Sequence, residues 1–263
     1  MEFWLAYLAT GLFAGILAGL LGVGGGLVIV PVLALIFAAQ QFPATHIMHL
    51  ALGTSLASIL FTSVSSLRAH HALGAVDWRV VRGISPGIIF GTLLGSLVAA
   101  QLSALFLKVF FIVFIYYVAV QMLLDIKPKP SRQLPGAVGL FAAGGVIGGV
   151  SSLVGIGGGT LTVPFMTWCN LKLHHAIGTS AAIGFPIAAA GALGFVLNGT
   201  LAQGLPQYSW GYVHLPALAG LVLGSVTTAP FGAKLAHRLP VALLKKIFAA
   251  LLLVLGTRML VSW

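Results

Sequence analysis

Gly22-Val23-Gly24-Gly25-Gly26-Leu27-Val28-Ile29-Val30-Pro31 returns later in the chain as Gly155-Ile156-Gly157-Gly158-Gly159-Thr160-Leu161-Thr162-Val163-Pro164. The offset is 133 residues at both ends of the motif (155 − 22 and 164 − 31). Each copy is followed by a histidine and then by Gly-Thr-Ser, which indicates a duplicated plan. Each copy also places helix-breaking glycines inside a hydrophobic stretch. In a membrane protein this combination points to a substrate site between the repeats.

Composition indicates a membrane protein. Only 6% of the residues are charged and 59% are hydrophobic, and the mean hydropathy is +1.11, whereas soluble domains have about 25% charged residues. Residues 3–67 and 173–233 contain no Asp, Glu, Lys or Arg. A bilayer span needs about 20 apolar residues, so each window holds at least two spans. A soluble globular protein is excluded.

Hydrophobic runs separated by glycine, proline and charge clusters predict ten segments. The predicted fold is an all-α polytopic membrane protein with helices broken at the glycine-rich motifs. The first repeat is expected at 1–125, a polar cytoplasmic linker at 126–135 and the second repeat at 136–263. The ten segments are 3–21, 24–39, 47–67, 80–100, 105–125, 136–154, 157–171, 175–197, 212–232 and 241–261.

Loop charge predicts the orientation. If all ten segments cross, the loops on one side carry eleven basic residues and those on the other side carry two, Lys108 and Arg258. This bias places the first side in the cytoplasm and both termini outside the plasma (inner) membrane. If segments two and seven were re-entrant, the split would be nearly even. The eleven residues are Arg68, Arg79, Arg82, Lys127, Lys129, Arg132, Lys172, Lys234, Arg238, Lys245 and Lys246.

The same charges predict that the two five-segment repeats are inverted. The loop after the third segment is basic, while its counterpart at 198–212 carries no charge. The next loop of each repeat reverses this bias. Opposite bias implies a pseudo-two-fold axis in the membrane plane, which many secondary transporters have.

The sequence offers almost no charge for chemistry inside a bilayer. Its only acids are Glu2, Asp77 and Asp125, all near predicted segment ends or in loops. Coupling to sodium or protons through a buried carboxylate is therefore not expected. A site without carboxylates suits an anion, and free backbone N–H groups, helix N-termini and hydroxyls all bind anions.

The predicted substrate site lies between the two glycine motifs, each of which precedes a short helix. Close helix packing is the alternative role of such glycines, and it is the role expected for Gly91, Gly95, Gly220 and Gly224. Three consecutive glycines exceed what packing needs, and the clusters lack the Lys-Ser/Thr of a nucleotide loop. The residues expected to bind substrate are Gly24, Gly25, Gly26, Thr54, Ser55, Gly157, Gly158, Gly159, Thr160, Thr179 and Ser180.

Histidine is the remaining titratable candidate. His49 and His174 align between the repeats and are candidates for proton coupling or anion contact, with an interfacial polar role as the alternative. His70 and His71 are expected to lie in a basic loop. No HExxH, GxSxG or paired-carboxylate centre occurs, so an enzyme, a metal site and a cofactor are not expected. Nucleic acid binding is not expected either, because no basic domain with interleaved aromatics exists.

The duplicated G-[VI]-G-G-G-x(4)-P motif, followed by Ala51–Ser55 and Ala176–Ser180, resembles the sulfite exporter TauE/SafE family of membrane permeases. The resemblance spans nearly the whole chain. It implies export of a sulfur-containing anion such as sulfite, thiosulfate or an organosulfonate. Thr160 and Thr162 have no hydroxyl counterpart in the first copy, which predicts an asymmetric site.

We therefore expect a secondary transporter that works by alternating access, with a passive anion channel as the alternative. Its expected partners are a small anionic substrate and the lipid bilayer, and assembly into a homo-oligomer stays open.

Overall fold

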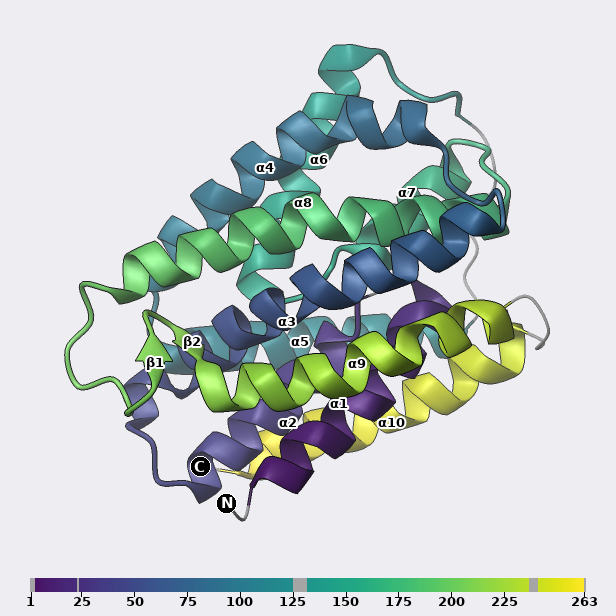
Figure 1. Ribbon diagram of the computed structural model, residues 1–263. Helices are drawn as coiled ribbons and strands as arrows, with labels where there is room; N and C mark the ends of the chain where they lie inside the picture. Colours follow the sequence, from purple (N-terminus) through teal and green to yellow (C-terminus); the bar gives the residue numbers. More distant parts are fainter. Residues whose placement is uncertain (1–2, 23, 125–131, 237–240, 263) are drawn as a thin grey trace.

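The computed structural model describes residues 3–22, 24–124, 132–236 and 241–262. Apart from one pair of two-residue strands, the regular structure of these residues is helical (Figure 1), which confirms the all-α class. The elements are α1 (Trp4–Leu21), α2 (Gly26–Ala39), α3 (Ala44–Ala72), α4 (Trp78–Gln101), α5 (Ala104–Leu123), α6 (Ala137–Val154), α7 (Gly159–Trp168), α8 (Leu173–Gly199), β1 (Ser209–Trp210), β2 (Val213–His214), α9 (Leu215–Ala236) and α10 (Val241–Val261).

The ten helices follow the ten predicted segments. The largest difference is at the end of the third segment, which was expected at 67 and lies at Ala72. The antiparallel pair of β1 and β2 was not predicted. Most of the predicted linker, residues 126–131, lies outside the described residues, as do Glu2 and Asp125.

Six of the described helices are long and apolar enough to cross a bilayer: α3, α4, α5, α6, α8 and α9. Helices α2 and α7 have 14 and 10 residues, which gives lengths of about 21 and 15 Å at 1.5 Å per residue. A hydrocarbon core is about 30 Å thick. The helical part of each of these two segments alone is therefore shorter than the core. The chain is a multi-pass membrane protein with two short helices inside its bundle.

Two pairs of helices pack along each other through glycine. Helix α1 lies against α9, and α4 lies against α6. A Cβ added at Gly91 would be 2.0 Å from the carbonyl oxygen of Gly145, and one at Gly224 would be 2.5 Å from the Leu12 nitrogen. Side chains at these positions would push the helices apart, so the predicted packing role of these glycines is confirmed.

Helices α3 and α8 contact each other in the middle of the bundle (Figure 1). In the most apolar window of α3, 83% of the residues are buried, compared with 33% in α6. Most of the serines and threonines of α3 are therefore buried among neighbouring helices. The start of α1 and the end of α10 lie at the same end of the molecule.

Candidate functional site

Each glycine motif ends one helix and starts the next with a left-handed glycine at corresponding positions. Helix α1 ends at Gly22 with φ +67°, and α2 begins after Gly25 with φ +79°. In the second copy Gly155 has φ +69° and Gly158 has φ +78°. These are left-handed conformations that glycine adopts without strain and other residues rarely adopt. The motif is therefore required to end one helix and start the next.

The two loops touch each other inside the protein. A Cβ at Gly24 would lie 3.2 Å from the Cα atom of Gly157, and one at Gly26 would lie 2.3 Å from the carbonyl oxygen of Gly155. The structure thus brings together the two motifs that the sequence predicted to share a site. The two loops can approach this closely because their glycines have no side chains.

Each loop is held by a serine from the other copy of the Gly-Thr-Ser sequence. The Ser55 hydroxyl donates to the carbonyl oxygen of Gly155 at 2.7 Å, and the Ser180 hydroxyl donates to that of Gly22 at 3.0 Å. All four residues are buried. Hydrogen bonds of this kind satisfy carbonyl groups that a helix end leaves without partners.

The neighbouring threonines make a second reciprocal pair. Thr179 accepts from the backbone N–H of Asp77, and Thr54 accepts from that of His214, both at 2.9 Å. Asp77 and His214 immediately precede α4 and α9. The Asp77 carboxylate accepts from the N–H groups of Arg79 and Val80, and the His214 Nδ1 atom accepts from the Ala217 N–H at 3.4 Å. Both residues therefore cap the helix that follows.

These bonds give a structural role to four predicted binding hydroxyls, those of Thr54, Ser55, Thr179 and Ser180. The Thr162 hydroxyl is also engaged, since it donates to Ser180 at 2.8 Å. The Thr160 hydroxyl, by contrast, is buried and has no hydrogen-bond partner among the described residues. Sequence reasoning could not predict the bonds of Thr54, Ser55, Thr179 and Ser180, because their partners lie 100 to 160 positions away along the chain.

The two aligned histidines differ. His49 is buried, and its Nε2 atom lies 3.1 Å from the carbonyl oxygens of both Ala99 and Leu102. Its ring stacks on Tyr212 with a centroid separation of 4.9 Å. His174 is exposed at the start of α8. The alignment therefore does not place them in equivalent surroundings.

His70 was expected in a loop but is buried within α3. Its Nε2 atom donates to the carbonyl oxygen of Gly19 at 3.1 Å, in the last turn of α1. His214, whose position in the sequence gave no signal, is surrounded by the rings of Tyr7, Phe37 and Phe42. Burial lowers the pKa of His214 to about 4, because an apolar environment disfavours the charged imidazolium.

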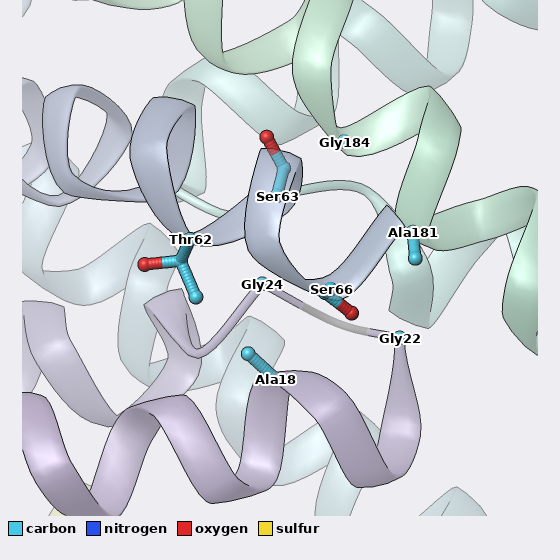
Figure 2. A pocket seen from close by; sticks show the side chains of 8 residues that line it. All are labelled: Ala18, Gly22, Gly24, Thr62, Ser63, Ser66, Ala181 and Gly184. Carbon is cyan, nitrogen blue, oxygen red and sulfur yellow. The ribbon is translucent and has the colours of Figure 1, made fainter. Parts of the chain in front are cut away.

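A pocket adjoins the first glycine loop (Figure 2). Its free volume is about 10 Å³, which is room for about one water molecule. The C-terminal half of α3 contributes its hydroxyl groups, and α8 contributes small residues. The lining residues are Ala18, Gly22, Gly24, Thr62, Ser63, Ser66, Ala181 and Gly184.

The described residues contain no group of three or more His, Cys, Asp or Glu side chains that could hold a metal ion.

A nearly charge-free helical bundle in which two glycine loops meet inside the protein is typical of multi-pass membrane transport proteins. The chain belongs to the sulfite exporter TauE/SafE family, whose model matches residues 7–259.

Similar proteins carry transporter names. A probable membrane transporter protein of Haemophilus influenzae is 38% identical over 262 residues, which cover 98% of each chain. A probable membrane transporter protein of Methanocaldococcus jannaschii is 27% identical and covers 95% of this chain and 93% of its own. Another, YdhB of Bacillus subtilis, is 28% identical over 88% of this chain and 89% of its own. No solved structure matches the chain.

Proposed function

We propose that this protein is a secondary transporter that exports a small sulfur-containing anion, such as sulfite, thiosulfate or an organosulfonate, by alternating access. The observation that carries the proposal is the meeting of the two glycine loops inside the bundle. Each loop leads into the N-terminus of a short helix, α2 or α7, where backbone N–H groups and the helix dipole favour negative charge.

The lack of acids supports an anion rather than a cation as substrate. Asp77 is the one acid among the described residues, and its carboxylate caps α4. A cation at the loops would have no carboxylate to compensate its charge. The name of the family supports a sulfur oxyanion as substrate and export as the direction, and no feature of the chain calls for an enzymatic role.

We infer that residues 1–125 and 136–263 form two inverted repeats joined by the linker 126–135. The matched packing of α1 on α9 and of α6 on α4 supports this inference. The reciprocal hydrogen bonds, from Ser55 to the second loop and from Ser180 to the first, support it too. Rocking of one repeat against the other around the paired loops would then expose the site to each side of the membrane in turn.

We also infer that both termini face outward and that the linker is cytoplasmic in the plasma membrane. The excess of basic residues in the loops of one side supports this orientation. An inside-negative potential then favours exit of an anion by about 2.3 kcal/mol per charge per 100 mV. Export therefore needs no carboxylate-based ion coupling.

Exchange of radiolabelled sulfite in proteoliposomes tests the proposal. A carrier should give uptake that saturates with sulfite and that is accelerated by unlabelled sulfite on the opposite side. Gly25→Val should abolish this exchange while the protein still inserts, because Val cannot adopt the left-handed backbone of the first loop. Large unitary currents would favour a passive anion channel, and normal exchange by the variant would contradict the role of the loops.

A further inference from the structure

The connection between α8 and α9 is much longer than its counterpart in the first half of the chain. It spans residues 200–214 and contains β1 and β2, and we call it the hairpin segment, whereas residues 73–77 join α3 to α4. The hairpin segment lies at the end of the molecule where α1 begins (Figure 1), and the His214 ring is 6.3 Å from that of Tyr7. Residues 73–77 lie at the opposite end, since the last turn of α3 bonds to the last turn of α1.

The two connections make the same backbone contact with the opposite half of the chain. A Cβ at Gly53 of α3 would lie 2.3 Å from the carbonyl oxygen of Tyr212, and one at Gly178 of α8 would lie 2.5 Å from that of Ala75. The threonine after each of these glycines accepts from the N–H group two residues further along the connection. The serine after each threonine holds a glycine loop. Each connection therefore packs beside the meeting point of the loops, one from each end.

The side chains at these corresponding places differ in size. The buried Tyr212 ring stacks on His49 of α3 with a centroid separation of 4.9 Å, and it lies edge-on to Phe195 of α8 at 6.4 Å. The ring therefore bridges α3 and α8. At the other end, Ala75 presents a methyl group in the corresponding place. The hairpin segment thus closes its end of the bundle with an aromatic side chain.

The hairpin segment belongs to the second half of the chain but is held by the first. The His46 Nε2 atom lies 3.0 Å from the carbonyl oxygen of Gln203, and Thr54 accepts from the His214 N–H at 2.9 Å. The rings around His214 also come from the first half, namely those of Tyr7, Phe37 and Phe42. Movement of one half against the other at this end would have to break these contacts.

We propose that the hairpin segment is a gate, with Tyr212 as the ring that closes the path between α3 and α8. The gate rests on the proposed transport function, because alternating access requires the contacts between repeats to break on one side of the site at a time. It opens when the hairpin segment leaves α3, while residues 73–77 stay on α8 and keep the opposite end closed. With both termini outside, this is the gate through which the exported anion leaves.

Cross-linking the hairpin segment to α3 tests the gate. His46→Cys and Gln203→Cys, combined with Cys169→Ala, place thiols at two neighbouring positions, one half-buried and one exposed. A short bismaleimide joins them through thioether bonds, which sulfite does not cleave as it cleaves disulfides. Sulfite exchange in proteoliposomes should fall about tenfold or more after cross-linking, because the gate can no longer open. Thr45→Cys with Gln203→Cys is a second pair that keeps His46.

The matched control joins the hairpin segment to its own half of the chain. Tyr208→Cys and Leu215→Cys, also with Cys169→Ala, place thiols at two exposed residues whose backbone groups share a hydrogen bond of 3.0 Å. The same bismaleimide should leave exchange unchanged in this variant, because no bond to α3 forms. An equal loss of exchange in the control would overturn the gate.

The melting temperature in sulfite separates the gate from the substrate site, since a ligand that binds the native state raises it. Cross-linked protein in detergent should keep the rise seen with wild type, because sulfite still enters from the opposite end. Full exchange after cross-linking, or loss of the melting shift together with exchange, would overturn the gate and leave the transport function standing. Wild-type protein that exchanges neither sulfite, thiosulfate nor an organosulfonate would overturn the proposed function and the gate with it.

Discussion

Helices α3 and α8 occupy corresponding places after the two glycine motifs, yet their buried faces differ in chemistry. Alignment of the Gly-Thr-Ser sequences gives an offset of 125 residues (180 − 55). From Ser55 onward, the buried face of α3 carries Ser58, Thr62, Ser66 and His70. The aligned positions of α8 after Ser180 are Ile183, Ile187, Gly191 and Phe195, which are buried too.

This difference changes which side chains surround each loop. At the second loop, Gly158 and Gly191 face side chains: a Cβ at Gly158 would be 2.3 Å from the Cδ1 atom of Ile187, and one at Gly191 would be 2.8 Å from that of Leu56. At the first loop, Ala181 stands where Leu56 stands in the other copy. A duplicated backbone thus places hydroxyl groups of α3 beside a small pocket at the first loop, whereas Ile187 and Leu56 fill the corresponding positions around the second.

The largest effect is expected when the Leu56 side chain is shortened. Leu56 is fully buried, so Leu56→Ala should lower the free energy of unfolding by about 2–5 kcal/mol, as other buried Leu→Ala changes do. Denaturation in detergent measures this loss. Leu56→Met, which conserves volume, is the control and should cost less than about 1.5 kcal/mol. Equal losses for the two variants would show that Leu56 does not fill a confined space.

Low pH should affect the His214 cap of α9 differently from the Asp77 cap of α4. His214 has a folded-state pKa of about 4 against about 6.5 unfolded. Below pH 6.5 the unfolded chain takes up a proton that the folded protein refuses. Stability is thus complete above pH 6.5 and falls by about 3 kcal/mol as the pH approaches 4. His214→Asn replaces the histidine by an uncharged residue that can cap α9 as Asp77 caps α4. The decrease in stability between pH 6.5 and 4 that His214 causes should vanish in this variant. A parallel pH dependence of the two proteins' unfolding would contradict the assignment.

The two loops themselves should respond differently to a methyl group. Gly25→Ala and Gly158→Ala should each cost about 1–2 kcal/mol for the left-handed backbone, with a further loss from overlap. At Gly25 the overlap is with the Ala14 carbonyl oxygen at 2.8 Å, which is backbone and cannot retreat. At Gly158 it is with the end of the Ile187 side chain.

A double-mutant cycle sharpens this contrast. Ile187→Val removes the Cδ1 atom that Gly158→Ala would strike, so the double variant should lose less stability than the sum of the single losses. Ile187→Val combined with Gly25→Ala is the control, and its losses should add. Additive losses in both cycles would show that the second loop is not confined by Ile187.

The smallest effect is expected at His174. Because it is exposed, His174→Ala should change the free energy of unfolding by less than about 0.5 kcal/mol and leave sulfite exchange intact. His49→Ala removes the side chain that bonds to the carbonyl groups of Ala99, which is buried, and Leu102, which is partly buried, and should cost about 1–3 kcal/mol. A comparable loss at both positions would show that the alignment of the histidines reflects a shared role.

The helices were predictable because hydrophobic runs and glycine breaks are local signals. The ends of α6, at Ala137 and Val154, differ by one residue or none from the predicted 136–154. The hairpin of β1 and β2 was missed because each strand has only two residues, too few for an alternating pattern.

The site was predictable only in part. The glycine loops are where the motif indicated, but Thr54 and Ser55 bond to the other half of the chain, and no local pattern encodes such partners. The buried Ser66 hydroxyl has no hydrogen-bond partner among the described residues. The sequence could have drawn attention to this serine, since hydroxyl residues at 3–4 residue spacing follow one face of α3. The residue type alone does not distinguish Ser66 from Ser58 and Thr62, whose hydroxyls bond to carbonyl groups of their own helix, as such residues commonly do.

The bond from Ser180 to the Gly22 carbonyl joins residues 158 positions apart. The ribosome makes Gly22 long before Ser180, and the two must enter the bilayer in that order. While the first five helices are alone in the membrane, the Gly22 carbonyl at the end of α1 lacks the Ser180 hydroxyl, whereas Gly155 emerges when its partner Ser55 has already been made. The first loop can therefore be completed only late in synthesis, whereas the second can be completed as soon as it is made.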